Sequence, residues 1–355
     1  MSTLMVMAGG TGGHVYPAVA VADHLRGEDW NIVWLATEGG MENRLIAGKD
    51  YAVEVIRMRG VRGKGLLQKL LAPGRVFVAC MQSFKALRAR KPDVVLGMGG
   101  FAAFPGGLMA WLLRYPLVIH EQNSIAGLTN RVLSHFARKV LAAFPSAFGD
   151  HADLVGNPVR AEIAAVPSPE QRFANRIGPL RVLVVGGSLG AQILNETVPQ
   201  ALALLPENAY PEVIHQAGEK HIAALNEHYR KANVHAETRA FIEDMAATYA
   251  WADLVICRAG AITIAELSAA GVASVLVPFP QAVDDHQTFN ARYLADNDAA
   301  ILLPQHEMTP EKLARQLQEF DREKLFAMAQ RARALGKPQA TAAVAQICKE
   351  MAREA

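Results

Sequence analysis

The sequence predicts an α/β protein with two Rossmann-like, doubly wound parallel-sheet domains that face a cleft. Two stretches of the same form support this prediction: residues 4–25 and, about 175 residues later, residues 180–195 (LRVLVVGGSLGAQILN). Each begins with a short apolar run, continues through a glycine turn and ends in a helical pattern, as in the βα unit of a parallel sheet. The alternation of strand-like and helical runs through both halves is typical of doubly wound sheets. We therefore expect one domain to open at each unit, with a ligand held between the two.

In the first half, apolar β-branched runs bounded by turns indicate strands, and apolar residues three or four positions apart indicate helices. We expect strands over residues 4–8, 31–37, 51–58, 93–97, 117–120, 139–143 and 153–155. We expect helices over residues 15–25, 66–90 and 106–113, and an interruption of the second near Pro73 and Gly74. Together these elements predict the first sheet and its covering helices.

In the second half, prolines at positions 158, 167, 169 and 179 mark a linker before the next sheet. We expect strands over residues 181–185, 212–216, 234–238, 254–257, 274–277 and 300–303. We expect helices over residues 191–205, 245–250, 261–270, 286–296 and 310–333. A last helix, 339–355, follows Pro338 and is expected to cross back to the first domain. The predicted domains are residues 1–158, with 338–355 packed on them, and residues 159–337.

The composition is that of an ordinary soluble enzyme. The chain has 355 residues, 51% of them apolar and 20% charged, and no unbroken apolar run is long enough to span a membrane. We expect no signal peptide, because the first residues already form a strand. Cys80, Cys257 and Cys348 lie far apart, which predicts a reducing compartment without disulfides. No cysteine or histidine spacing suggests metal ligands, so we expect no metal and no other cofactor.

The charge is distributed unevenly, although the formal net charge is only +2. Residues 1–160 contain 18 basic and 11 acidic residues, whereas the remainder contains 18 and 23. Between Glu54 and Asp93 there is no acidic residue, and the basic residues there are Arg57, Arg59, Arg62, Lys64, Lys69, Arg75, Lys85, Arg88, Arg90 and Lys91. Such a block predicts an anionic partner for the first domain, but a solvated helix face would give the same pattern.

Four glycine turns at predicted strand ends indicate a phosphorylated ligand. They are residues 9–13, 97–100 and 186–190, and Gly260 ahead of Ala261. A glycine turn that leads into a helix directs backbone N–H groups and the positive end of the helix dipole at an anion. The alternative is that these glycines only permit tight βα turns.

Other nucleotide-binding motifs are absent. A G-x-G-x-x-G fingerprint would need glycine where Val15 or Ser188 stands, and there is no P-loop, which argues against a nicotinamide-dependent oxidoreductase. An Asp-x-Asp pattern at residues 296–298 is more typical of a helix end than of a metal-held nucleotide.

The stretch 257–266 (CRAGAITIAE) combines a strand end, a glycine and the start of an apolar helix. Glu266 has two interpretations. It completes a capping box with Thr263, or its carboxylate accepts two hydrogen bonds from a sugar diol.

Seven motifs decide between such interpretations. They are MAGGTGGHVYP (7–17), GMGGF (97–101), HEQN (120–123), GNPVR (156–160), GGSLGA (186–191), RAGA (258–261) and DHQT (285–288). With these motifs in register over nearly its whole length, the chain resembles the MurG family of bacterial glycosyltransferases. The resemblance implies a GT-B fold with an acceptor and membrane domain followed by a donor domain. It also implies transfer of N-acetylglucosamine from UDP-N-acetylglucosamine to the C4 hydroxyl of the muramoyl sugar of lipid I. The transfer inverts the anomeric carbon and forms lipid II for peptidoglycan synthesis.

The resemblance further implies a donor site. Its residues are Thr11, Gly12, Gly13, Asn123, Arg160, Ser188, Ile242, Ala261, Ile262, Thr263, Ile264, Ala265, Glu266 and Gln287. By position, Ser188 contacts phosphate and the main chain of Ile242 contacts uracil. Residues 261–263 line the diphosphate and sugar, Glu266 holds the ribose hydroxyls, and Gln287 binds N-acetylglucosamine. Thr11, Gly12, Gly13, Asn123 and Arg160 close on the donor.

The acceptor hydroxyl needs a general base, and we expect it to be His14. A helix start disfavours imidazolium, so His14 should stay neutral and able to accept a proton. The alternative is a polar residue that satisfies loop N–H groups; His120 and Glu121 are weaker candidates for the base. The leaving diphosphate needs positive charge, which Arg160 and the helix start at Ala261 supply without a metal.

The resemblance implies a partner for the basic residues between Glu54 and Asp93, namely an anionic membrane, because lipid I carries a diphosphate and lies in an anionic bilayer. We expect peripheral contact of the first domain with the cytoplasmic face of the bacterial inner membrane. The apolar residues available for it are Leu66, Leu67, Leu70, Leu71, Phe77 and Val78. Cell-wall synthesis proteins are further partners that this role allows, and nothing points to nucleic acid.

Three other functions stay open at this point. One is another GT-B enzyme, such as a UDP-sugar epimerase or a lipid glycosyltransferase, against which the His14 loop and the HEQN motif argue. The others are a nicotinamide oxidoreductase and a non-catalytic UDP-sugar-binding protein.

Overall fold

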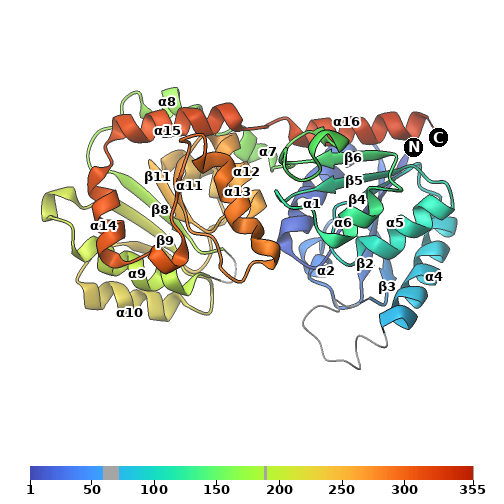
Figure 1. Cartoon of the computed structure of the whole chain (residues 1–355), viewed down its shortest axis with the longest axis horizontal. Helices are drawn as coiled ribbons and strands as arrows, with labels where there is room; N and C mark the ends of the chain where they lie inside the picture. Colours follow the sequence, from blue (N-terminus) through green and yellow to red (C-terminus); the bar gives the residue numbers. More distant parts are fainter. Residues whose placement is uncertain (59–71, 188–189, 355) are drawn as a thin grey trace. The chain divides into compact units, whose positions relative to one another are not determined.

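The computed structural model describes residues 1–58, 72–187 and 190–354 (Figure 1). The predictions for Leu66, Leu67, Leu70, Leu71 and Ser188 fall outside the described residues. The chain divides into two compact units, Met1–Arg160 with Pro338–Ala355, and Ala161–Lys337. Each unit is a parallel sheet covered by helices, so the doubly wound α/β class predicted from the sequence is confirmed (Figure 1).

The first unit contains a seven-stranded sheet in the order β3-β2-β1-β4-β5-β6-β7. Its strands are β1 (Thr3–Met7), β2 (Asn31–Thr37), β3 (Ala52–Ile56), β4 (Val94–Gly97), β5 (Leu117–Glu121), β6 (Lys139–Ala142) and β7 (Asp153–Leu154). The central strand is β1, in which Met5 pairs with Val33 of β2 and Val95 of β4. The central strands are buried on both faces, which is why they read in the sequence as continuous apolar runs.

Helices cover both faces of this sheet. They are α1 (Gly12–Arg26), α2 (Met41–Leu45), α4 (Ala72–Arg90), α5 (Ala103–Leu112), α6 (Leu128–Leu133) and α16 (Ala340–Arg353), with the 3₁₀ turn η1 (Gly149–His151). One face shares a core with α1 and α16, in which Leu25 and Cys348 are fully buried. The other shares a core with α4 and α5, in which Leu87 and Ala110 are fully buried. The end of the chain thus belongs to the first unit.

The second unit contains a six-stranded parallel sheet in the order β10-β9-β8-β11-β12-β13. Its strands are β8 (Arg181–Val185), β9 (Glu212–Gln216), β10 (Glu237–Arg239), β11 (Leu254–Cys257), β12 (Ala273–Leu276) and β13 (Ile301–Leu302). Its helices are α7 (Ala161–Ala164), α8 (Pro169–Phe173), α9 (Gln192–Ala203), α10 (Ile222–Ala232), α11 (Met245–Trp251), α12 (Ala261–Ala270), α13 (His286–Ala295), α14 (Pro310–Glu319) and α15 (Arg322–Leu335). Three 3₁₀ turns join them: η2 (Glu207–Ala209), η3 (Val283–Asp285) and η4 (Gln305–Glu307).

All thirteen predicted strands are present. Residues 31–37, 181–185, 212–216 and 254–257 coincide with β2, β8, β9 and β11 from end to end. The largest shift concerns β10, which begins three residues later than the predicted 234–238. Apolar runs therefore locate the strands of both sheets well.

Several helix predictions are wrong. Residues 310–333 form two helices, because Asp321 accepts a hydrogen bond from Lys324 N and starts α15 after the extended Phe320. Pro73 and Gly74 lie inside α4 as it is described from Ala72, and residues 66–71 of the predicted helix fall outside the described residues. The helices α2, α6, α7, α8 and α10 are not predicted from the sequence; α10, the longest of them, buries only the side chains of Leu225 and Tyr229.

Two observations concern the compositional predictions. The three cysteines are buried free thiols. Over residues 1–58, 72–187 and 190–354, every helix is too short or too polar to cross a bilayer.

Candidate functional site

Each sheet has a topological switch point between its first and fourth strands, β1 and β4 in the first unit and β8 and β11 in the second. In open parallel sheets, ligands bind beside such a point at the carboxyl ends of the strands. The glycine turns 9–13 and 97–100 follow β1 and β4, whereas 186–190 and Gly260 follow β8 and β11. The described residues of the four turns singled out in the sequence therefore lie at the two switch points.

The two turns of the first unit pack closely on each other. Gly99 and Gly100 have φ values of +85° and +77°, which favour glycine. A side chain at Gly100 would collide with the carbonyl oxygen of Gly9, and one at Gly99 would lie 3.2 Å from the His14 ring. These glycines thus leave the space that the His14 imidazole occupies.

His14 lies in the first turn of α1, directly after Thr11, Gly12 and Gly13. Thr11 is the N-cap residue, and its carbonyl oxygen accepts from His14 N at 3.1 Å. The His14 side chain is half-buried, and its Nδ1 lies 2.7 Å from Oε1 of Gln122. The predicted base is therefore held at the switch point by a residue to which the sequence analysis assigned no role.

Gln122 follows β5 and connects His14 to a second histidine. Its Nε2 lies 3.0 Å from His120 Nδ1, and His120 Nε2 lies 2.9 Å from the carbonyl oxygen of Gly156. His120 is fully buried, and burial lowers its pKa to about 4, so the ring is neutral at pH 7. With both ring nitrogens engaged inside the unit, His120 has no atom available to a substrate.

The Glu121 carboxylate accepts hydrogen bonds from the loop that follows it and from Asn130. Its Oε1 accepts from Asn123 N at 3.0 Å and Nδ2 at 3.2 Å, while Oε2 accepts from Gly127 N at 3.1 Å and Asn130 Nδ2 at 2.9 Å. The carboxylate is 1% exposed, so its role is to position Asn123 and not to contact a substrate. His14 is thus the accessible member of the three candidates for the base.

Glu42 is a further residue that sequence reasoning missed. Its fully buried carboxylate accepts from Thr37 N at 2.8 Å, from Thr37 Oγ1 at 2.6 Å and from Gly10 N at 3.4 Å. It fixes the first glycine turn from beneath. Its partners lie five and 32 positions away, and no local pattern links Gly10 to Glu42.

In the second unit, α12 begins directly after β11. Gly260 is its N-cap residue and makes no side-chain capping bond. The backbone N–H groups of the first turn, from Ala261 to Thr263, thus lie at the switch point, where a helix start favours an anion.

The capping-box interpretation of Glu266 is wrong. Gly260 occupies the N-cap position, so Thr263 is the third residue of the helix and Glu266 lies in the second turn. Glu266 is half-buried, and its Oε2 accepts a hydrogen bond from Tyr249 Oη at 3.2 Å. Its carboxylate thus faces the neighbouring helix α11 and does not cap α12.

Buried Arg172 secures the other end of α12. It donates to the carbonyl oxygens of Ala270 at 3.2 Å and of Gly271, and its Nη1 donates to Tyr249 O at 3.4 Å. Burial lowers the pKa of Arg172 to about 10, so the guanidinium is still charged at pH 7. A cation at a helix C-terminus complements the dipole, and this one ties α11 to α12.

Gln287 is positioned by the loop before α13. Its Oε1 accepts from Phe279 N at 2.9 Å. The loop is anchored in turn by Arg258, whose Nη1 donates to the carbonyl oxygens of Val277 at 3.1 Å and Pro278 at 3.2 Å. The oxygen of the Gln287 amide is thus engaged with the loop.

The remaining predicted residues divide between the units. Ile242 follows β10 and its side chain is 2% exposed, so only its main chain can meet a ligand. Ile264 is likewise fully buried, whereas Ile262 and Ala265 are half-buried. Arg160 is half-buried at the end of the first unit. Thr11, Gly12, Gly13, His14 and Asn123 therefore gather in the first unit, and Ala261 to Glu266 with Gln287 in the second.

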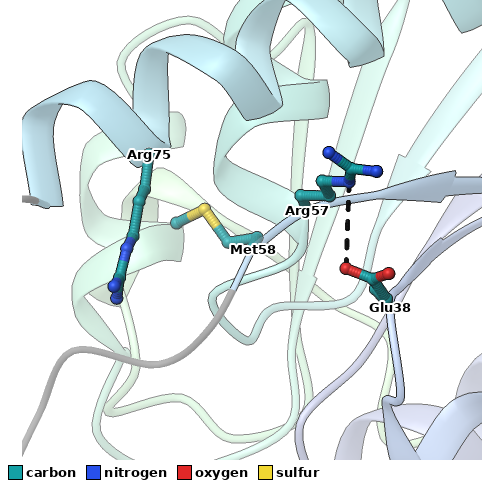
Figure 2. A pocket seen from close by; sticks show the side chains of 4 residues that line it. All are labelled: Glu38, Arg57, Met58 and Arg75. Carbon is teal, nitrogen blue, oxygen red and sulfur yellow. Dashed lines mark ion pairs between the residues drawn. The ribbon is translucent and has the colours of Figure 1, made fainter.

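A separate pocket lies at the edge of the first sheet, and none of the predicted site residues lines it (Figure 2). It is lined by Glu38 after β2, Arg57 and Met58 after β3, and Arg75 in α4. Figure 2 shows the ion pair between Arg57 Nε and Glu38 Oε2, at 3.9 Å, with Arg75 on the other side of Met58. Three of these four residues belong to the basic, acid-free segment or border it.

Comparisons with known proteins agree with this arrangement. Residues 4–142 match the glycosyltransferase family 28 N-terminal domain, and residues 181–349 match its C-terminal domain. The UDP-N-acetylglucosamine–N-acetylmuramyl-(pentapeptide) pyrophosphoryl-undecaprenol N-acetylglucosamine transferases of Azoarcus sp. and Dechloromonas aromatica are 58% and 56% identical, over 99% of this chain and of each relative. The crystal structure of Acinetobacter baumannii MurG is 42% identical with a TM-score of 0.89, covering 99% of this chain and all of that one.

Proposed function

The chain belongs to glycosyltransferase family 28, and we propose that its two units divide one transfer reaction between them. The chain is a UDP-N-acetylglucosamine-dependent N-acetylglucosaminyltransferase that converts lipid I to lipid II in peptidoglycan synthesis. The observation that carries this function is the identity of 56–58% to transferases of that name, over nearly the whole length of both chains.

The first unit supplies the base. His14 lies at the start of α1 with Nδ1 held by Gln122 Oε1, and its Nε2 takes the proton of the acceptor hydroxyl. The C4 oxygen of the muramoyl sugar attacks the anomeric carbon from the face opposite UDP. A bond forms between that oxygen and the anomeric carbon, the bond to the diphosphate breaks, and UDP leaves with the electron pair. A positioned general base typically contributes about 10²–10⁴-fold in rate.

The second unit holds the donor. The N–H groups at the start of α12, from Ala261 to Thr263, meet the diphosphate, and Glu266 accepts hydrogen bonds from the ribose hydroxyls. The Gln287 amide nitrogen contacts N-acetylglucosamine, and the main chain of Ile242 contacts uracil. The support for this is local: Gly260 caps α12 without a side-chain bond, and Gln287 Oε1 is occupied by Phe279 N.

Residues near the reacting bond complete the proposed donor site. Arg160 supplies positive charge to the departing diphosphate, and Ser188 contacts phosphate. Thr11, Gly12, Gly13 and Asn123 close on the donor from the first unit. A helix terminus contributes about 0.3–1 kcal/mol per exposed charge and more when it is partly buried, so the guanidinium is the larger contributor.

Release of UDP tests this function. We expect the purified chain to release UDP from UDP-N-acetylglucosamine only when a lipid I analogue is present, with the disaccharide product found by mass spectrometry. An epimerase would turn over the sugar nucleotide without an acceptor, and a binding protein would release no UDP. Either result would refute the transferase assignment.

We further propose that α4 and α5 of the first unit form a peripheral contact with the cytoplasmic face of the inner membrane. Phe77 and Val78 of α4 are 67% and 46% exposed, and Trp111 and Leu112 of α5 are 44% and 56% exposed. The two helices pack side by side, so these side chains belong to neighbouring elements (Figure 1). Large apolar side chains on adjacent helices are typical of a surface that enters a bilayer interface.

The same helix carries the charge that an anionic surface would attract. Arg75, Lys85 and Arg88 of α4 are exposed. A basic residue near such a surface contributes about 1 kcal/mol, so Lys85→Gln should weaken binding to vesicles about fivefold. Co-sedimentation with phosphatidylglycerol vesicles measures this, with phosphatidylcholine vesicles as the control. Binding that is insensitive to salt and to lipid charge would contradict an electrostatic contact.

A further inference from the structure

A buried amide joins the two histidines of the first unit. Gln122 is 1% exposed, and its side chain ends between them. Its Oε1 lies 2.7 Å from His14 Nδ1. Its Nε2 lies 3.0 Å from His120 Nδ1 and 3.0 Å from the His120 carbonyl oxygen. Each polar atom of the amide therefore has a defined partner.

The His120 carbonyl fixes which way the amide faces. A carbonyl oxygen only accepts hydrogen bonds, so the atom of Gln122 that meets it must be the NH₂ nitrogen. The amide oxygen then faces His14, and because this oxygen also only accepts, His14 Nδ1 must carry a proton. In a neutral imidazole the lone pair is then on Nε2.

The Gly156 carbonyl independently fixes the orientation of the Gln122 amide, through the His120 ring. It lies 2.9 Å from His120 Nε2, which must therefore carry the proton. Since His120 is neutral, its Nδ1 is an acceptor and needs a donor, and Gln122 Nε2 is at the right distance. Two independent acceptors thus impose one direction on the chain, from His14 through Gln122 and His120 to Gly156.

We propose that Gln122 is a positioning residue that holds His14 in the Nδ1–H tautomer, with the Nε2 lone pair directed to the acceptor hydroxyl. This inference rests on the proposed role of His14 as the base. Glutamate could not replace Gln122 fully, because a carboxylate has no donor for His120 Nδ1 and would face the His120 carbonyl oxygen. The amide therefore orients the base without placing a formal charge beside it.

The tautomer can be observed without any assay of activity. In the full chain labelled with ¹⁵N-histidine, long-range ¹H–¹⁵N correlation distinguishes protonated from unprotonated ring nitrogens, and His14→Gln identifies the signals of His14. We expect wild-type His14 to be protonated on Nδ1. In Gln122→Met we expect the Nε2–H form to appear, whereas Gln122→Glu keeps an acceptor and should keep the Nδ1 proton. Protonation of wild-type His14 on Nε2 would overturn the proposal.

Kinetics provides the second readout. Loss of a residue that orients a reacting group typically costs about 10–100-fold, so Gln122→Met should lower kcat by that factor and leave the KM for UDP-N-acetylglucosamine within about twofold. Gln122→Glu should retain more activity than Gln122→Met. Asn157→Ala, which removes a hydrogen bond of 2.9 Å to the Gln122 carbonyl oxygen, is the control for disturbance of the same loop.

Failure of the proposal for Gln122 can be distinguished from failure of the proposed base His14. If Gln122→Met lowers kcat while the His14 tautomer is unchanged, Gln122 is only structural and the inference is wrong. If the tautomer changes as expected but His14→Ala keeps full kcat, the inference about Gln122 holds and the proposed base is wrong. Should Gln122→Met fail to fold, the wild-type spectrum alone still tests the proposal, because protonation of His14 on Nε2 would overturn it.

Discussion

Both units bury a histidine in their sheet, His120 in β5 and His215 in β9. Burial lowers the pKa of the two rings to about 4 and about 3, so both are neutral at pH 7. His215 Nδ1 lies 2.9 Å from Tyr229 Oη, and its Nε2 lies 3.1 Å from Asn195 Oδ1. These partners belong to α10 and α9 and are buried with it. The hydrogen bonds of His120, in contrast, lead to half-buried His14 at a helix start.

The comparison shows that burial and a lowered pKa do not by themselves mark a functional histidine. Both rings satisfy that description. They differ in where the chain of hydrogen bonds ends: in the core for His215, and at the switch point for His120. His215 therefore joins helices to the sheet, and His120 is hydrogen-bonded through Gln122 to His14, the proposed base.

The largest effect should come from His14→Ala. Loss of a general base typically lowers kcat about 10²–10⁴-fold, and the donor site lies in other residues, so the KM for UDP-N-acetylglucosamine should change little. Steady-state kinetics with a lipid I analogue measures both. An unchanged kcat would remove His14 from the chemistry and make its network structural, like that of His215.

A smaller effect, on binding and not on chemistry, is expected in the second unit. Glu266→Gln removes the charge that is proposed to accept the ribose hydroxyls, and hydrogen bonds to charged groups contribute about 1.5–3 kcal/mol. The KM for UDP-N-acetylglucosamine should rise about tenfold or more, with kcat nearly unchanged. Tyr249→Phe removes the hydrogen bond to Glu266, keeps the Glu266 carboxylate and serves as the matched control. Equal effects of both variants would show that Glu266 acts on α11 and not on the donor.

His215→Leu should affect stability alone. It leaves Tyr229 Oη and Asn195 Oδ1 without their buried partner, which typically costs about 1–3 kcal/mol. Urea unfolding measures the loss, and kcat of the folded enzyme should stay within about twofold. His120→Leu is the paired variant, for which we expect the stability loss together with a lower kcat. A drop in kcat for both would erase the distinction between the two networks.

The smallest effect concerns pH. An unfolded histidine titrates near its ordinary value of 6.5, whereas His215 in the folded chain titrates near 3. As the pH falls below 6.5, the unfolded chain takes up a proton that the folded chain does not, and stability is lost. The contribution of His215 is therefore complete above about pH 6.5 and declines as the pH falls towards 3. Urea unfolding at pH 7, 6 and 5 should show a shallower decline for His215→Leu than for wild type; parallel declines would contradict it.

The sequence predicts the strands well because they are buried on both faces, as Leu4 to Met7 are. It misses α10, whose apolar face is narrow, and the break before Asp321, where neither proline nor glycine signals an end. In the site, glycine turns and helix starts are local patterns and are predicted.

Contacts between distant positions are not predicted. Gln122 lies 108 positions from His14, and nothing in the HEQN motif says which of its residues faces inward or which ring it meets. Glu42 likewise reaches Gly10 only through the folded sheet. Thr263 and Glu266 have the spacing of a capping box, but the helix begins earlier, at Ala261, and excludes that interpretation.

A crystal structure of the full chain with bound UDP tests most directly the division between a donor-binding unit and a base-supplying unit. The account predicts the diphosphate against the first-turn N–H groups of α12 and the ribose hydroxyls on Glu266. A diphosphate bound instead at residues 9–13 of the first unit, or held through a divalent cation, would contradict it.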